Sequence, residues 1–145
     1  MTMAQTLDQV FGAPPIASGL FDVDASGAPF LMGGHCEQCD RYVFPYSESC
    51  PACLSGMKHV RLGGEGVIYS HTTVRTKPPY GLPQPYSVAF IDLNDAPLRI
   101  FALLDHSMAG GFRIGDRVKL KVGVIGHDGE GDPRARGYFT LKDSR

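Results

Sequence analysis

The chain has 145 residues, enough for one ordinary domain or for one domain with a small appendage. Hydrophobic residues make up 43% and charged residues 20%, a balance that excludes disorder, although 18 glycines and 11 prolines predict many turns. The formal net charge of −1 argues against a protein that binds phosphate backbones. No apolar run reaches the roughly 20 residues of a membrane span, and the start of the chain lacks the pattern of a secretory signal. We therefore expect a cytoplasmic protein that does not enter the membrane.

The first predicted elements are a short helix and a hairpin. Residues 4–11 predict the helix, which the Gly- and Pro-containing residues 12–15 would end. A helix of this length is not stable alone in water, so it must dock on this domain or on a partner. The strand patterns at 21–23 and 29–32 flank a turn and predict a hairpin. We assign residues 1–30 to this helix and hairpin, as a docking arm.

All four cysteines follow within the next 25 residues of the chain, as two Cys-x-x-Cys pairs: Cys36 with Cys39, and Cys50 with Cys53. A Cys-x-x-Cys turn directs two sulfurs toward one point, and two such turns complete a tetrahedral S₄ cage, the geometry that zinc accepts. Four thiolate ligands leave no coordination position for water or substrate, so the predicted metal is structural. We assign residues 31–62 to a zinc ribbon.

Other interpretations of the cysteines remain open. Iron would fit the same S₄ geometry. Two disulfides are disfavoured in a reducing compartment, and a redox dithiol uses one pair near a βαβ pattern, which this sequence lacks. His35 adjoins Cys36, but four thiolates leave no place for it as a ligand. The five histidines form no recognisable catalytic arrangement, and we interpret all of them as structural or surface residues: His35, His59, His71, His106 and His127.

After the ribbon, alternating hydrophobic patterns predict β-strands over residues 66–74, 86–93, 98–104, 117–125 and 138–141. A short helical or irregular link near 105–111 and a polar loop at 128–133 separate the later strands. Five strands with one such link suit a small Greek-key barrel of the OB type, which we assign to residues 63–145. The predicted fold is therefore mainly β: a zinc ribbon followed by a five-stranded barrel, with a short N-terminal helix.

These motifs together resemble a known family of acyl-CoA-associated proteins, long described as a domain of unknown function, in which a rubredoxin-like zinc ribbon is joined to an OB-fold. The resemblance covers roughly residues 30–141 and combines motif with predicted context. Where the family has Gly-Ser after the second cysteine pair, this chain has Leu54-Ser55-Gly56. The matching segments are Cys36-x-x-Cys39, Phe44-Pro45, Cys50-Pro51-x-Cys53, Gly64-x-Gly66-x-Ile68-Tyr69-Ser70-x-Thr72, Tyr86-x-Val88-Ala89-x-Ile91-Asp92-Leu93 and Ile114-Gly115-Asp116-Arg117-Val118.

The resemblance implies a non-catalytic subunit beside thiolases and thiolase-like enzymes, or beside hydratase and aldolase partners that act on CoA thioesters. Family members support assembly or substrate handling, and some serve the degradation of sterols or aromatic compounds. A thiolase needs an activated cysteine nucleophile, and here the predicted ribbon uses every cysteine. We therefore expect a hetero-oligomer in which the partner performs the chemistry on the acyl-CoA.

The Pro-rich stretch 77–86 is either a partner-binding element with a preset backbone or a surface connector. If the resemblance holds, Arg75 and Lys77 are candidate contacts for CoA phosphates, and Tyr80 is a candidate contact for CoA or the partner. The later cations Arg113, Arg117 and Lys119 are further candidates. For each of these cations, a solvated outward position on a strand is the simpler interpretation.

The main alternative function is binding of single-stranded nucleic acid, because zinc ribbons and OB-folds both bind single strands elsewhere. Five aromatic residues are candidate stacking platforms, but their alternation within strands favours core packing: Tyr69, Phe90, Phe101, Tyr138 and Phe139. The net charge weighs against this alternative. A stand-alone hydrolase or redox enzyme would need a nucleophile–base pair or an open metal site, which the sequence does not show.

Overall fold

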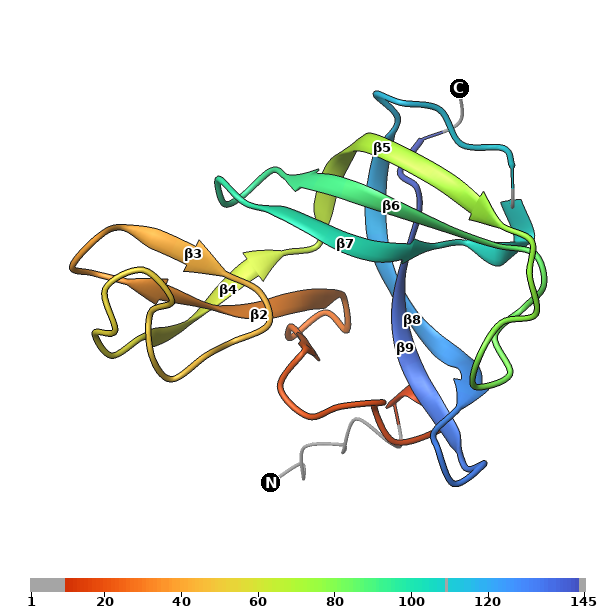
Figure 1. The fold of residues 1–145 in the computed structure, drawn as a ribbon, viewed down its shortest axis with the longest axis horizontal. Coiled ribbons are helices and arrows are strands. Elements are labelled where there is room, and N and C mark those ends of the chain that lie inside the picture. Colours follow the sequence, from red (N-terminus) through yellow and green to blue (C-terminus); the bar gives the residue numbers. More distant parts are fainter. Residues whose placement is uncertain (1–9, 109, 144–145) are drawn as a thin grey trace.

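The computed structural model describes residues 10–108 and 110–143, and strands dominate it. The mainly β class predicted from the sequence is confirmed (Figure 1). No helix in the described part of the chain is long and apolar enough to cross a membrane. The elements are β1 (Phe21–Val23), β2 (Pro29–Cys36), β3 (Arg41–Val43), β4 (Lys58–Gly63), β5 (Glu65–Val74), β6 (Tyr86–Leu93), β7 (Arg99–Leu104), the 3₁₀ turn η1 (His106–Met108), β8 (Arg117–His127) and β9 (Pro133–Leu141).

The first four strands form an antiparallel sheet in which β2 pairs with β1, β3 and β4. The predicted hairpin is confirmed, with Phe21 opposite Leu31. β4 was not predicted as a strand. Gly33 in β2 lets the strands approach closely, because a Cβ there would lie 2.4 Å from both a Leu62 methyl carbon and the Val43 carbonyl oxygen. This sheet carries the cysteine pairs at its far end.

The remaining strands form a closed barrel in the order β5-β6-β7-β9-β8, so the predicted five-stranded barrel is confirmed. Neighbouring strands are antiparallel except β7 and β9, whose parallel pairing is limited to two residue pairs at the C-terminal end of β7. β8 and β9 form a longer hairpin than predicted, with a turn from Asp128 to Asp132 between them. The seam between β7 and β9 is therefore the weakest part of the barrel wall.

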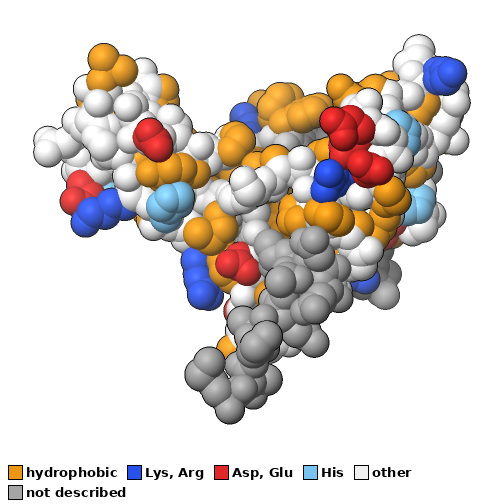
Figure 2. All heavy atoms as spheres, turned by 90° about the horizontal axis from the view of Figure 1, so that it is seen from below, with side chains coloured by type: hydrophobic (Ala, Val, Ile, Leu, Met, Phe, Trp, Pro, Cys, Tyr) orange, Lys and Arg blue, Asp and Glu red, His pale blue; other side chains and the backbone are white. Residues whose placement is uncertain are grey.

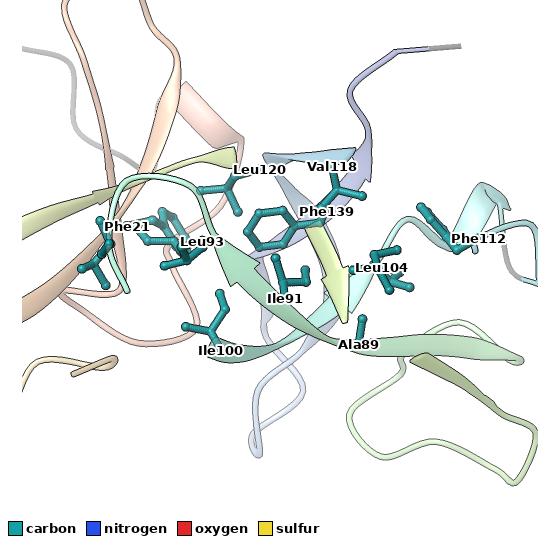
Figure 3. Close-up of a cluster of buried hydrophobic side chains, with 14 residues drawn as sticks. Phe21, Ala89, Ile91, Leu93, Ile100, Leu104, Phe112, Val118, Leu120 and Phe139 are labelled. Atoms are coloured by element: carbon teal, nitrogen blue, oxygen red, sulfur yellow. The ribbon is translucent and has the colours of Figure 1, made fainter. Parts of the chain in front are cut away.

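One hydrophobic cluster fills the barrel and continues into the base of the ribbon sheet. Phe139, which is 1% exposed, lies beside Ile91 and Val118 in the middle of the cluster (Figure 3). Phe21 and Leu31 join the same cluster from the ribbon sheet. Burial of this continuous apolar surface favours a fixed arrangement of ribbon and barrel.

The helix expected over residues 4–11 falls almost wholly outside the described residues, and only Val10 and Phe11 of it are described, in helical conformation. The short N-terminal helix is therefore unsupported. The segment that follows pairs with the edge of β9: Ile16 N donates to the Ala135 carbonyl at 2.9 Å, and Ala135 N donates to the Pro14 carbonyl at 2.7 Å. This segment therefore pairs with a part of β9 that does not pair with β7.

Candidate functional site

The two cysteine pairs come together at the end of the ribbon sheet. Cys36 is the last residue of β2, and the first pair spans the turn into β3, whereas the second pair lies in the loop between β3 and β4. All four sulfur atoms lie within 4.8 Å of one another. The closest approaches join opposite pairs: Cys36 Sγ is 3.5 Å from Cys53 Sγ, and Cys39 Sγ is 3.4 Å from Cys50 Sγ.

This arrangement fits one tetrahedral metal ion. With zinc–sulfur bonds near 2.3 Å, the edges of an S₄ tetrahedron are about 3.8 Å long, close to the sulfur separations seen here. One cysteine of each pair, Cys36 and Cys50, is fully buried, and the other two are exposed. The cage therefore closes at the protein surface, with all four positions taken by sulfur.

The thiols influence one another strongly. Hydrogen bonds from Ser55, first from its side chain and then from its backbone, lower the pKa of Cys53 to about 6. The hydrogen bond between Cys39 and Cys50, with burial, raises the pKa of Cys39 to about 12. Ala52 N also donates to Cys50 Sγ at 3.4 Å. Thiols this close share protons, and a divalent cation that replaced those protons would satisfy all four sulfurs.

His35 takes part in packing and hydrogen bonding next to the cage. Its Nε2 lies 2.7 Å from an Asp40 carboxylate oxygen, and its ring packs on Tyr42 with ring centroids 4.5 Å apart. Across the first cysteine pair, Lys58 and Glu37 form an exposed ion pair at 2.8 Å. These contacts connect the cysteine turns to β3 and β4.

The Pro-rich loop between β5 and β6 lies over the end of β8 (Figure 1). Gln84 Nε2 donates to the Arg75 carbonyl at 2.9 Å, and His127 N donates to the Tyr80 carbonyl at 2.8 Å. The Tyr80 ring is 52% exposed and meets the His127 ring edge-on. The side chains of Arg75 and Lys77 are exposed. The structure thus places these three predicted contact residues on one anchored surface loop.

The other candidate cations are dispersed. Arg117 forms an exposed ion pair with Asp143 at 2.6 Å, and Arg113 is exposed in the turn before β8. Lys119 lines a cavity between ribbon and barrel. Arg117 therefore has a structural partner, as the simpler interpretation of an outward position implies.

The expectation of core packing is wrong for three of the five aromatic residues. Tyr69, Phe90 and Phe101 are 52%, 45% and 60% exposed, whereas Phe139 is buried. Successive side chains of a strand point to opposite faces of the sheet. Phe90 and Phe101 therefore point outward, because their neighbours Ile91 and Ile100 are buried. The sequence could have indicated it through that alternation, but apolar residues on both faces of a strand conceal which face is inside.

Tyr69, Phe90 and Phe101, with Arg99, form a surface that we call the aromatic face. Phe90 and Phe101 are opposite each other on β6 and β7, with ring centroids 5.3 Å apart. The Arg99 guanidinium lies 3.3 Å above the Tyr69 ring and forms an ion pair with Asp92 at 2.7 Å. A bulge in β5 between residues 68 and 70 accompanies Tyr69. Exposed aromatic and Arg side chains are enriched at protein–protein interfaces.

Known proteins share both the ribbon and the barrel of this chain. Residues 30–58 match the rubredoxin-like zinc ribbon domain of ChsH2, and residues 59–123 match its C-terminal OB-fold domain. The chain is 36% identical over 116 residues to the benzoylsuccinyl-CoA thiolase subunit BbsA of Thauera aromatica, covering 79% of this chain and 78% of BbsA. The chain belongs to the ChsH2 (DUF35) family.

A further relative agrees with this assignment, and a solved structure shares the fold. A DUF35 domain-containing scaffold protein of Methanocaldococcus jannaschii is 28% identical over 111 residues, covering 74% of this chain and 78% of the relative. The solved structure of the Ltp2-ChsH2(DUF35) aldolase has a chain with the same fold, at a TM-score of 0.61 and 24% identity, covering 79% of this chain and 86% of that one. The family resemblance inferred from the motifs is confirmed.

Proposed function

We propose that the chain is a non-catalytic, metal-containing subunit of a thiolase-type acyl-CoA enzyme complex, in which it supports assembly and the binding of the CoA thioester. The observation that carries the proposal is the 36% identity to a benzoylsuccinyl-CoA thiolase subunit, across both ribbon and barrel. From the family resemblance, the pathway we propose is the degradation of aromatic compounds or of sterols.

The metal we propose is zinc, held by the four cysteines as a structural ion. The S₄ donor set and the sulfur separations suit zinc, and iron would fit the same cage. When bound, the ion supplies rigidity and no reaction step. Elemental analysis of the purified protein distinguishes the two metals, with one zinc per chain as the expected result and one iron per chain as the contrary one.

The catalytic nucleophile belongs to the partner in this proposal. All four cysteines of the chain lie in the cage, so no thiol remains to attack a thioester. The chain contributes surfaces instead. We propose that the aromatic face contacts the acyl-CoA enzyme, and that the loop with Arg75, Lys77 and Tyr80 contacts the enzyme or the CoA thioester that it holds.

Affinity purification of the tagged protein from its native host, followed by mass spectrometry, tests the proposal. A thiolase or another acyl-CoA enzyme should elute with the chain in stoichiometric amount. An unaccompanied monomer, or co-eluting nucleic acid, would refute the proposal.

A pair of variants tests the aromatic face. Phe101→Ser removes a 60% exposed ring from the aromatic face, and Ile114→Ser removes a 70% exposed side chain from the turn before β8. Ile114→Ser should leave the free energy of unfolding within about 0.5 kcal/mol of wild type, because it is at the surface. Phe101→Ser should lower it by about 1 kcal/mol at most, because it loses the cross-strand contact with Phe90. Phe101→Ser should weaken partner binding at least tenfold and Ile114→Ser should not, as measured by titration of the purified partner. Equal affinities of the two variants would remove the aromatic face from the interface.

A further inference from the structure

A cavity of about 590 Å³ lies where the chain passes from the ribbon sheet into the barrel. Its walls come from the β1–β2 turn, β2, β4, β5, the β6–β7 turn and β8. Gly64 permits the close approach of ribbon and barrel, because a Cβ there would lie 2.8 Å from the Pro29 carbonyl oxygen. The cavity is therefore built into the junction, and its size is within the roughly 300–1,000 Å³ of small-molecule sites.

Three basic side chains line this junction cavity: Arg61 from β4, and Lys119 and Lys121 from β8. Considering only contacts among residues 10–108 and 110–143, none of the three forms an ion pair with a carboxylate. Five other basic residues of the chain do form ion pairs: Lys58, Arg99, Arg117, Arg134 and Lys142. The two lysines are thus available to a ligand, whereas Arg61 also interacts electrostatically with Asp24.

Three carboxylates also line the cavity, and two of them have partners of their own. Asp24 Oδ1 accepts hydrogen bonds from Ser26 N, Ser26 Oγ and Ala28 N, and its charge also attracts Arg61. Glu65 is opposite Lys119 in the strand register, but its Oε2 pairs with Lys142 Nζ at 2.8 Å. Asp95, in the β6–β7 turn, is the third carboxylate. Counting Lys142, which pairs with Glu65, four cations stand against three carboxylates here, a formal net charge of +1.

We propose that the junction cavity binds the phosphate-bearing nucleotide end of a CoA thioester. Lys119 and Lys121 bind the phosphate groups through charge-assisted hydrogen bonds, and Arg61 contributes the planar fork that suits a phosphate. Asp95 accepts a hydrogen bond from a ribose hydroxyl. This inference rests on the proposed function, because that function is what makes CoA the relevant nucleotide.

A nucleotide fits the junction cavity better than a free phosphate ion does. The volume far exceeds that of an inorganic phosphate. The Arg61 guanidinium already lies over the Phe30 ring, 4.2 Å from its centroid. Guanidinium planes and aromatic rings both stack on bases, so this pair supplies a flat surface beside the cations.

The test uses the full chain and isothermal titration with four probes: CoA, 3′,5′-ADP, dephospho-CoA and ATP. CoA and 3′,5′-ADP should bind with similar affinity, because both carry the nucleotide end. Dephospho-CoA should bind about tenfold more weakly, since it lacks one charged phosphate contact. If ATP binds as tightly as CoA, the assignment to CoA is wrong. It is also wrong if 3′,5′-ADP does not bind.

Three variants locate the site. Lys119→Ala/Lys121→Ala should weaken binding of CoA at least tenfold, and Arg61→Gln should weaken it in the same direction. Arg75→Ala/Lys77→Ala removes the same charge from the Pro-rich loop, and Arg41→Ala/Lys58→Ala removes it from exposed positions on the ribbon. Circular dichroism confirms that each variant is folded. Loss of CoA affinity in the loop variant, with none in the junction variants, would overturn the proposal.

The same variants separate this inference from the proposed function. If the acyl-CoA enzyme co-purifies with wild type and with Lys119→Ala/Lys121→Ala, while the affinity for CoA is equal in both, then the junction site is wrong and the subunit function stands. If no acyl-CoA enzyme co-purifies with wild type, the proposed function is refuted, whatever the titrations give.

Discussion

Leu54 occupies a backbone conformation that suits glycine. It directly follows the second cysteine pair, as Asp40 follows the first, and their φ values are 64° and 54°. The left-handed region costs an ordinary L-residue about 1–2 kcal/mol, and Asp tolerates it better than Leu does. The Leu54 side chain is 79% exposed, so packing within the chain does not offset this cost.

Leu54→Gly should therefore stabilise the protein by about 1 kcal/mol, because glycine adopts this conformation without steric strain. Leu54→Ala is the matched control, since it removes the exposed side chain and keeps the strained backbone. Urea denaturation of the metal-loaded protein measures both. Equal free energies of unfolding for the two variants would show that backbone strain at residue 54 is negligible.

At the scale of the elements, the ribbon divides into a base and a tip. The base contributes Phe21, Leu31 and Leu62 to the barrel core. The buried hydrophobic cluster of the tip contains only Cys36, Cys50 and Met57, with Val43 and Tyr46 packed against it. So small a cluster buries too little apolar surface to order the tip, so the metal must supply most of its stability.

Removal of the metal should therefore unfold the tip and spare the barrel. Treatment with a chelator, or Cys50→Ser, should abolish hydrogen-exchange protection over residues 36–58 while β5 to β9 stay protected. Ser47→Ala is the control, because it lies in the same loop and is not a cysteine. Full protection of residues 36–58 after the metal has been removed would contradict a metal-dependent tip.

The β8–β9 turn is stabilised by one carboxylate. Backbone hydrogen bonds from Asp132 and Glu130, with the nearby Arg134, lower the pKa of Asp128. A carboxyl whose pKa is lowered by folding stabilises the protein above its unfolded pKa, near 3.9, and this stabilisation is lost as the pH falls through the lower folded value.

Asp128→Asn should therefore destabilise the protein at neutral pH, and its penalty should shrink as the pH falls from about 3.9 through the lower folded pKa, because wild type loses its stabilisation over that range. Urea denaturation of wild type and variant across the acidic range measures the difference. A penalty that is constant with pH would show that the charge of Asp128 does not stabilise the turn. Glu130→Gln is the control, because its carboxylate is exposed at the same turn.

At the scale of the whole molecule, the net charge and the exposed aromatic residues favour different kinds of partner. The exposed aromatic face would suit stacking of bases, whereas the net charge of −1 would not attract a nucleic acid. Figure 2 shows acidic and basic side chains interspersed over the face seen from below, without a continuous basic groove there. Four metal-bound thiolates make the chain more negative still. The balance favours a protein partner at the aromatic face.

We therefore expect no saturable binding of a single-stranded DNA of about 20 nucleotides at concentrations below about 100 µM in physiological salt. Fluorescence anisotropy measures this directly. Micromolar binding that weakens steeply with salt, and that is lost in Phe101→Ser, would instead favour the nucleic-acid function.

The sequence by itself determined the local features of this protein. The Cys-x-x-Cys spacing predicted the cage, because two residues between cysteines suffice to place both sulfurs on one turn. Alternating Val, Ile and Leu residues predicted the five barrel strands, since the period of two is a property of each strand alone. Residues in one segment carry all the information in each of these cases.

Only the tertiary structure decided features that depend on distant segments. Which face of β6 and β7 is inside depends on the closure of the barrel, and this closure exposes Phe90 and Phe101. The junction cavity brings Arg61 together with Lys119 and Lys121, about 60 residues later in the chain. Side chains that far apart in sequence meet only through packing of one sheet on another. The hydrophobic periodicity within a single strand does not predict such a contact.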